Sequence, residues 1–135
     1  LDAIVTGDTS AIDGLLADNF MDYGPGINDS LDRAATIAWY KNNWRNSWKS
    51  VNFDRYTMLS VSLKDGKVPG DWVLDWGIVT VKHKDGTPDL KFQWHGVFRM
   101  ENGKIAQANA FFDQSDILKQ IGYKFVPPDL TATSK

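Results

Sequence analysis

The stretch LKFQWHGVFRMENGKIAQANAFF, residues 90–112, decides the fold. Two segments of alternating side chains flank Glu101-Asn102-Gly103, whose Asn-Gly pair favours the positive backbone angles of a hairpin turn. We expect a three-residue loop with a bulge. One face of the hairpin then carries the large apolar side chains and the alanines: Phe92, Trp94, Gly96, Phe98, Ala106, Ala108, Ala110 and Phe112. The opposite face is mixed polar, so we expect helices to cover only the apolar side.

Segments before and after the hairpin complete the expected fold. The expected strands lie at residues 51–63, 72–83, 90–100 and 105–112, with a brief extended piece at 20–23. The expected helices lie at residues 1–5, 11–17, 31–48 and 117–121. Helices followed by long antiparallel strands predict an α+β fold in which the N-terminal helices pack on one face of a curved sheet. We expect one domain over residues 1–125, whose first helix starts upstream of residue 1, and a loose polar tail over 126–135.

Length and composition narrow the classes of function. The chain has 135 residues, which is one domain's worth, and its 15 Lys+Arg against 17 Asp+Glu give a net charge of −2. No basic footprint indicates nucleic acid as a partner, and no apolar run reaches the ~20 residues that span a membrane. With no cysteine and two histidines we expect no disulfide and no metal site. The cytoplasm is the default compartment, and export stays open.

Three stretches carry a resemblance to a known family. They are TGDTSAIDGLLADNF at 6–20, FRMENGKI at 98–105 and DQSDILKQIG at 113–122. In this order and spacing the chain resembles the SnoaL-like branch of the nuclear transport factor 2-like superfamily. The resemblance implies a cone in which a bent sheet wraps helices around one deep, mainly apolar pocket. Members include isomerases, cyclases, dehydratases, epoxide hydrolases and proteins that catalyse nothing, so the fold does not settle the function.

Catalytic positions of two family branches can be carried over residue by residue. Ketosteroid isomerases place their general base just before a proline that matches Pro25, where this chain has Gly24, and their second carboxyl group aligns with Gly96. Steroid isomerisation of that type is therefore not expected. SnoaL-like cyclases use an Asp that matches Asp113, assisted by a histidine for which His95 is the candidate. Both residues also have a structural interpretation, Asp113 as a helix cap and His95 at a subunit contact or in solvent.

Aromatic side chains form the expected wall of the pocket. Those expected to line it are Tyr23, Tyr40, Trp44, Trp48, Trp76, Trp94, Phe98 and Phe112. Pure core packing is the alternative for the helical stripe of Tyr40, Trp44 and Trp48. The alternation leaves the direction of Asp22 undecided. We expect Asp75 to point outward, because an unpaired carboxylate is costly to bury.

Three functions remain open at this point. The main expectation is a SnoaL-like protein whose pocket binds a small apolar molecule, with no cofactor and no assigned reaction. One alternative is a cofactor-free acid–base enzyme of the cyclase, isomerase, dehydratase or epoxide hydrolase type that uses Asp113. Another is a non-catalytic scaffold. We also expect a homodimer formed through the outer face of the sheet.

Overall fold

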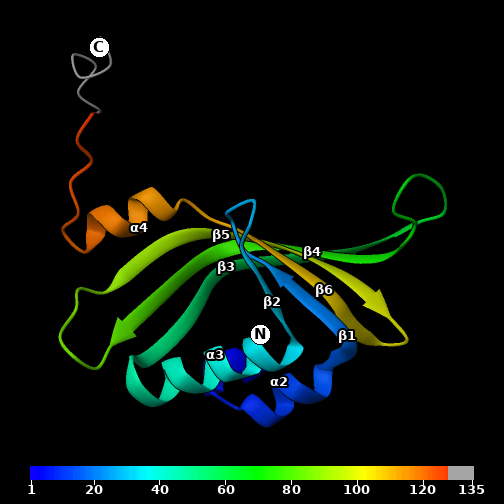
Figure 1. The fold of residues 1–135 in the computed structure, drawn as a ribbon, viewed down its shortest axis with the longest axis horizontal. Helices are drawn as coiled ribbons and strands as arrows, with labels where there is room; N and C mark the ends of the chain where they lie inside the picture. Colours follow the sequence, from blue (N-terminus) through cyan, green and yellow to red (C-terminus); the bar gives the residue numbers. More distant parts are fainter. Residues whose placement is uncertain (128–135) are drawn as a thin grey trace, which may run out of the picture.

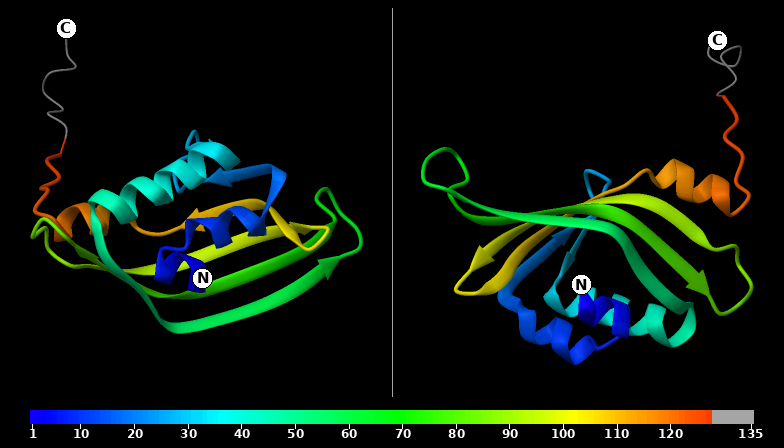
Figure 2. Two further views of the ribbon diagram at one scale, coloured as in Figure 1. Left: turned by 90° about the horizontal axis from the view of Figure 1, so that it is seen from below. Right: turned by 180° about the vertical axis from the view of Figure 1, so that it is seen from behind.

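A bent six-stranded sheet covers the N-terminal helices in the computed structural model, which describes residues 1–127 (Figures 1 and 2). The strand order is β2-β1-β6-β5-β4-β3, with β1 parallel to β6 and every other pair antiparallel. The helices are α1 (Asp2–Thr6), α2 (Thr9–Leu15), α3 (Arg33–Asn46) and α4 (Gln114–Gln120). The strands are β1 (Leu16–Tyr23), β2 (Ser30–Asp32), β3 (Trp48–Leu63), β4 (Gly70–His83), β5 (Leu90–Glu101) and β6 (Lys104–Phe111). The predicted α+β architecture is confirmed; of the predicted tail, residues 128–135 lie outside the described part.

Aspartates begin three of the four helices. The carboxylates of Asp8, Asp32 and Asp113 accept hydrogen bonds from backbone N–H groups in the first turns of α2, α3 and α4. The helix predicted to start at residue 31 starts at Arg33 instead, because the three residues before it pair with β1. Cap chemistry and strand pairing together therefore set where each helix begins.

The hairpin of β5 and β6 turns more tightly than the sequence suggested. Asn102 and Gly103 have φ angles of 50° and 75°, and Glu101 pairs directly with Lys104, so the loop has two residues. The bulge lies inside β6, where the register shifts opposite Arg99 and Met100. The shift keeps the predicted apolar set of this hairpin on the concave side.

A bulge in β3 bends the sheet near its middle. Asp54 pairs with Ile78 and Thr57 with Trp76, so that two residues of β3, Arg55 and Tyr56, lie opposite Gly77 alone. Arg55 takes a φ of 49° at this point. A Cβ atom on Gly77 would lie 2.9 Å from the backbone oxygen of Asp54, which leaves room for glycine only. Because an extra residue bends a strand and increases its twist, the bulge contributes to the curvature of the sheet.

Strand β4 presents its odd-numbered residues to the concave side. Val79 and Val81 are buried there and form a core cluster with Val51, whereas Trp76 lies on the outer face and is 43% exposed. Asp75 is on the concave side and 1% exposed, so the expectation that it points outward is wrong. The sequence did not reveal this because β4 carries apolar side chains on both faces, and alternation alone does not say which face is inside.

The close approach at Gly77 is testable. We expect Gly77→Ala to lower the free energy of unfolding by about 1–3 kcal/mol, because the new methyl group meets backbone atoms that cannot move aside. Gly14→Ala is the matched control, since a Cβ there meets nothing within 4 Å. This control should gain about 0.5–1 kcal/mol from its better helix propensity. Urea unfolding measures both, and equal stability of Gly77→Ala and the wild type would contradict the close packing at the bulge.

Candidate functional site

Two adjoining cavities lie between the helices and the concave side of the sheet. We call the first, about 300 Å³, the Asp75 cavity; Ile12, Tyr56, Asp75 and Met100 are among its lining residues. We call the second, about 680 Å³, the aromatic cavity; its rings include Trp48, Phe53, Phe92, Trp94 and Phe112. Six residues line both cavities: Leu1, Ile4, Asp22, Tyr40, Phe98 and Ala108. These shared residues make Asp22 the carboxyl group at the junction.

Asp75 is held by two donors from the neighbouring strand. Its Oδ1 atom accepts hydrogen bonds from the Trp94 indole N–H at 3.0 Å and from the Gly96 backbone N–H at 2.8 Å. Asp75 and Gly96 are register partners, and a Cβ atom at 96 would collide with Oδ1 and lie 2.7 Å from Phe98 Cζ. The glycine therefore provides the space that the carboxyl group occupies.

Buried polar atoms in the Asp75 cavity lack partners among the described residues. They are Oδ2 of Asp75, the hydroxyl of Tyr56 and the hydroxyl of Thr36. Tyr56 comes from the bulge of β3, and its pKa is raised by burial and by the neighbouring Asp75 carboxylate. Because buried polar groups are normally hydrogen-bonded, these atoms are available to a ligand or to water.

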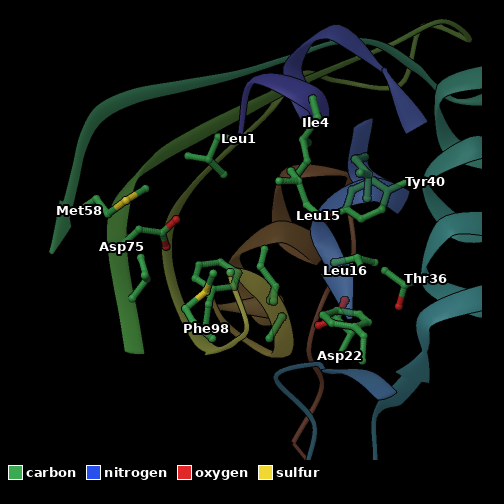
Figure 3. Close-up of a pocket in the computed structure, with 18 of the residues that line it drawn as sticks. Leu1, Ile4, Leu15, Leu16, Asp22, Thr36, Tyr40, Met58, Asp75 and Phe98 are labelled. Carbon is green, nitrogen blue, oxygen red and sulfur yellow. The ribbon is translucent and has the colours of Figure 1, made fainter. Parts of the chain in front are cut away.

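Asp22 lies across the cavity from Asp75. Alternation along β1 puts Asp22 on the same side as the buried Phe20, and Figure 3 shows its carboxyl group and the Tyr40 ring on the opposite side of the cavity from Asp75. Burial raises the pKa of Asp22 from 3.8 to about 6. Burial and the Asp22 charge also raise the pKa of Tyr40. The cavity thus contains a carboxyl group that titrates close to neutral pH.

Five of the predicted wall residues line a cavity, and three do not. Those that do are Tyr40, Trp48, Trp94, Phe98 and Phe112. Trp44 packs against Trp48 and over Gly7, whose Cβ position lies 3.0 Å from the indole. Tyr23 is 37% exposed and points away from the side taken by Asp22, and Trp76 lies on the outer face. None of these three residues lines either of the two cavities.

The predicted pair of Asp113 and His95 is not brought together, and neither residue lines either of the two cavities described above. Oδ1 of Asp113 accepts hydrogen bonds from the Ser115 N–H at 2.9 Å, the Ser115 hydroxyl at 2.6 Å and the Asp116 N–H at 3.1 Å. These bonds lower the pKa of this exposed carboxyl group. The His95 ring lies on the outer face, 6.5 Å from the Trp76 ring. Asp113 is thus a helix cap, and the aspartates that line the cavities are Asp22, Asp29 and Asp75. For Asp75 the available sequence signal was Gly96, a glycine in the middle of the strand that pairs with it.

A bent sheet closed by N-terminal helices over an internal cavity defines the cone-shaped α+β class of proteins. Residues 1–108 match the SnoaL-like domain, and the chain belongs to this family. No curated protein matches the chain. Within residues 1–127, no helix is long and apolar enough to cross a membrane.

Solved structures with the same fold come from enzymes and from proteins of open function. An LEH-like epoxide hydrolase from M. tuberculosis has a TM-score of 0.62 and 19% identity, with 90% of this chain and 82% of that chain covered. A candidate polyketide cyclase from Silicibacter sp. TM1040 has a TM-score of 0.70 and 16% identity, with 90% and 89% covered. A candidate isomerase from Bacillus subtilis has a TM-score of 0.68 and 12% identity, with 94% and 90% covered. At these identities the likeness shows the fold alone.

The raised pKa of Asp22 predicts a pH-dependent cost in stability. As pH rises from about 4 to 6, the unfolded chain loses this proton while the folded protein keeps it, so the folded state becomes less stable. We expect the free energy of unfolding of Asp22→Asn to exceed that of the wild type by about 1–2 kcal/mol at pH 7.5 and to equal it at pH 4. Asp18→Asn, an exposed change on the same strand, is the control in urea unfolding. A gain that is the same at both pH values would contradict the buried titration.

Proposed function

We propose that this protein binds a small, mainly apolar molecule in the joined cavities and catalyses a proton transfer on it. The observation that carries the proposal is the pair of carboxyl groups across an apolar cavity, one of them with a pKa of about 6. An acid–base catalyst works best when its pKa lies near the operating pH. Asp22 fits this requirement in place of Asp113, which the sequence had suggested.

Each polar group has a distinct part in the proposed reaction. At neutral pH the Asp22 carboxylate accepts a proton from a C–H or O–H bond of the ligand, or from a water molecule that attacks an epoxide carbon. The resulting carboxylic acid returns the proton at a second position of the ligand, to the oxygen released when the epoxide opens, or to water. Across the cavity, Oδ2 of Asp75 and the Tyr56 hydroxyl orient the polar group of the ligand. The apolar wall restricts water, which strengthens the interactions of these groups with the ligand. Isomerisation, cyclisation and epoxide opening all fit this scheme, and the structural neighbours described above are named for these three kinds of reaction.

Turnover of a panel of small cyclic enones and epoxides tests the proposal. We expect proton exchange or ring opening whose kcat/KM rises with pH through about 6, as Asp22 becomes a free base. Asp22→Asn should lower kcat/KM by about 100-fold or more, and Asp18→Asn should leave it unchanged. Activity that survives in Asp22→Asn would refute the role of this carboxyl group. Ligand binding without turnover of any panel member would favour the non-catalytic pocket.

We also propose that two copies of the chain pair through the outer face of the sheet. Trp76, His95 and Phe111 lie side by side there, with ring centroids 6.5 Å and 5.9 Å from that of His95. Trp76 is 43% and Phe111 51% exposed, which is a large aromatic area to leave in water. The three residues come from adjacent strands, so a second copy related by a two-fold axis can cover them with its own aromatic strip.

Light scattering tests this pairing. We expect a dimer mass for the wild type and a monomer mass for Trp76→Asp, because the new charge would be buried at the contact. Val68→Asp, in the turn between β3 and β4, places the same charge on another exposed apolar residue and should remain a dimer. A wild-type monomer at micromolar concentration would disprove the pairing.

A further inference from the structure

The walls of the two cavities carry acids without basic side chains. Among the described lining residues the charged side chains are Asp22, Asp29 and Asp75, and no Lys, Arg or His side chain lines either cavity. The ion pairs of the described chain join Arg33, Lys82 and Arg99 to other acids, away from the junction. The ionised Asp22 carboxylate at the edge of this apolar cavity therefore has no basic side chain beside it in the cavity wall.

The aromatic cavity offers the second element of a cation site. The rings of Trp94 and Phe112 are stacked with centroids 6.1 Å apart, Phe92 lies 5.5 Å from Phe112, and Phe53 lies 6.5 Å from Trp94. All four rings line the aromatic cavity, whose wall also includes Asp22. Ring faces attract organic cations, and the attraction increases where water is excluded. Rings together with an unpaired carboxylate favour a positive charge.

Resting on the proposed function, we propose that the ligand is an organic cation: a compact apolar body with an amine that is protonated at neutral pH. Its ammonium group lies at the cavity junction, where it donates to the Asp22 carboxylate and contacts the rings. A second N–H or O–H group of the ligand donates to Oδ2 of Asp75, which is buried and unpartnered. An anionic ligand would meet carboxylates in a wall that has no basic side chain to pair with it.

Three probes that share one hydrocarbon cage isolate the charge: 1-adamantylammonium, 1-adamantanol and 1-adamantanecarboxylate. Calorimetry at pH 7.5 is expected to show the ammonium binding at least about 10-fold tighter than the alcohol, with the carboxylate weakest. Asp22→Asn should reduce the affinity for the ammonium to that for the alcohol. Asp18→Asn removes the same charge from an exposed position on β1 that lines neither cavity, and it should keep the full preference.

The outcomes separate this inference from the proposed function. Equal affinity for the three probes, or a preference that persists in Asp22→Asn, overturns the cation inference and leaves the cavity as a binding site. Failure of all three probes to bind overturns the cavity as a binding site and the cation inference with it. Thermal unfolding of Asp22→Asn at the same pH checks that the variant is folded, and its expected higher stability makes misfolding an unsuitable explanation for lost affinity.

Discussion

The bulge in β3, where two residues lie opposite one residue of β4, sets the curvature on which the cavity depends. The extra residue adds to the bend of the sheet, and the glycine at 77 allows the bulge to lie against β4. The same bulge contributes Tyr56 to the wall of the Asp75 cavity. A flat sheet would let helix side chains fill the concave face, as in an ordinary two-layer core. The backbone irregularity thus links sheet curvature, cavity and one polar group of the site.

Polar groups in this interior are tolerated only because the neighbouring strand supplies donors. Asp75 receives an indole N–H and a backbone N–H on one oxygen, which offsets part of the cost of removing its carboxyl group from water. The second oxygen of Asp75 has no partner among the described residues, and burial beside an apolar wall raises the pKa of Asp22. Neither arrangement improves stability. Natural sequences that break packing rules in this way usually do so at functional sites, and here both exceptions line the same cavity.

Local sequence signals predicted the architecture better than the site. The hairpin at 90–112 placed Trp94 and Phe98 on the concave side correctly, because Ala-rich β6 and aromatic β5 define that face without ambiguity. Strand β4 has apolar residues at both parities, so alternation within the strand does not show which face is inside; its orientation follows from the regular pairing with β5, in which Asp75 lies opposite Gly96 and Trp76 opposite His95. For this reason Trp76 was predicted to face the pocket and Asp75 to point outward, whereas the structure has them the other way round. Asp113 was chosen through family resemblance, and the capping geometry that its surrounding residues favour takes up its carboxylate.

The two glycines that argued against steroid isomerisation acquire a different meaning in the structure. Gly24 lies two residues beyond Asp22, and a step of two residues along an extended chain returns to the same side. Gly96 is the register partner of Asp75, whose carboxyl group fills the space that a side chain at 96 would need. Asp22 thus lies two residues before Gly24, the position aligned with the family's general base. Asp75 lies on the strand next to Gly96, the position aligned with the family's second carboxyl group. Both carboxyl groups still line the cavity. A curved sheet permits such exchange because neighbouring concave positions converge on one space. Aligning this chain with the catalytic positions of a relative therefore tests only that relative's mechanism. The chemistry of the cavity follows from which residues on the concave side carry polar groups.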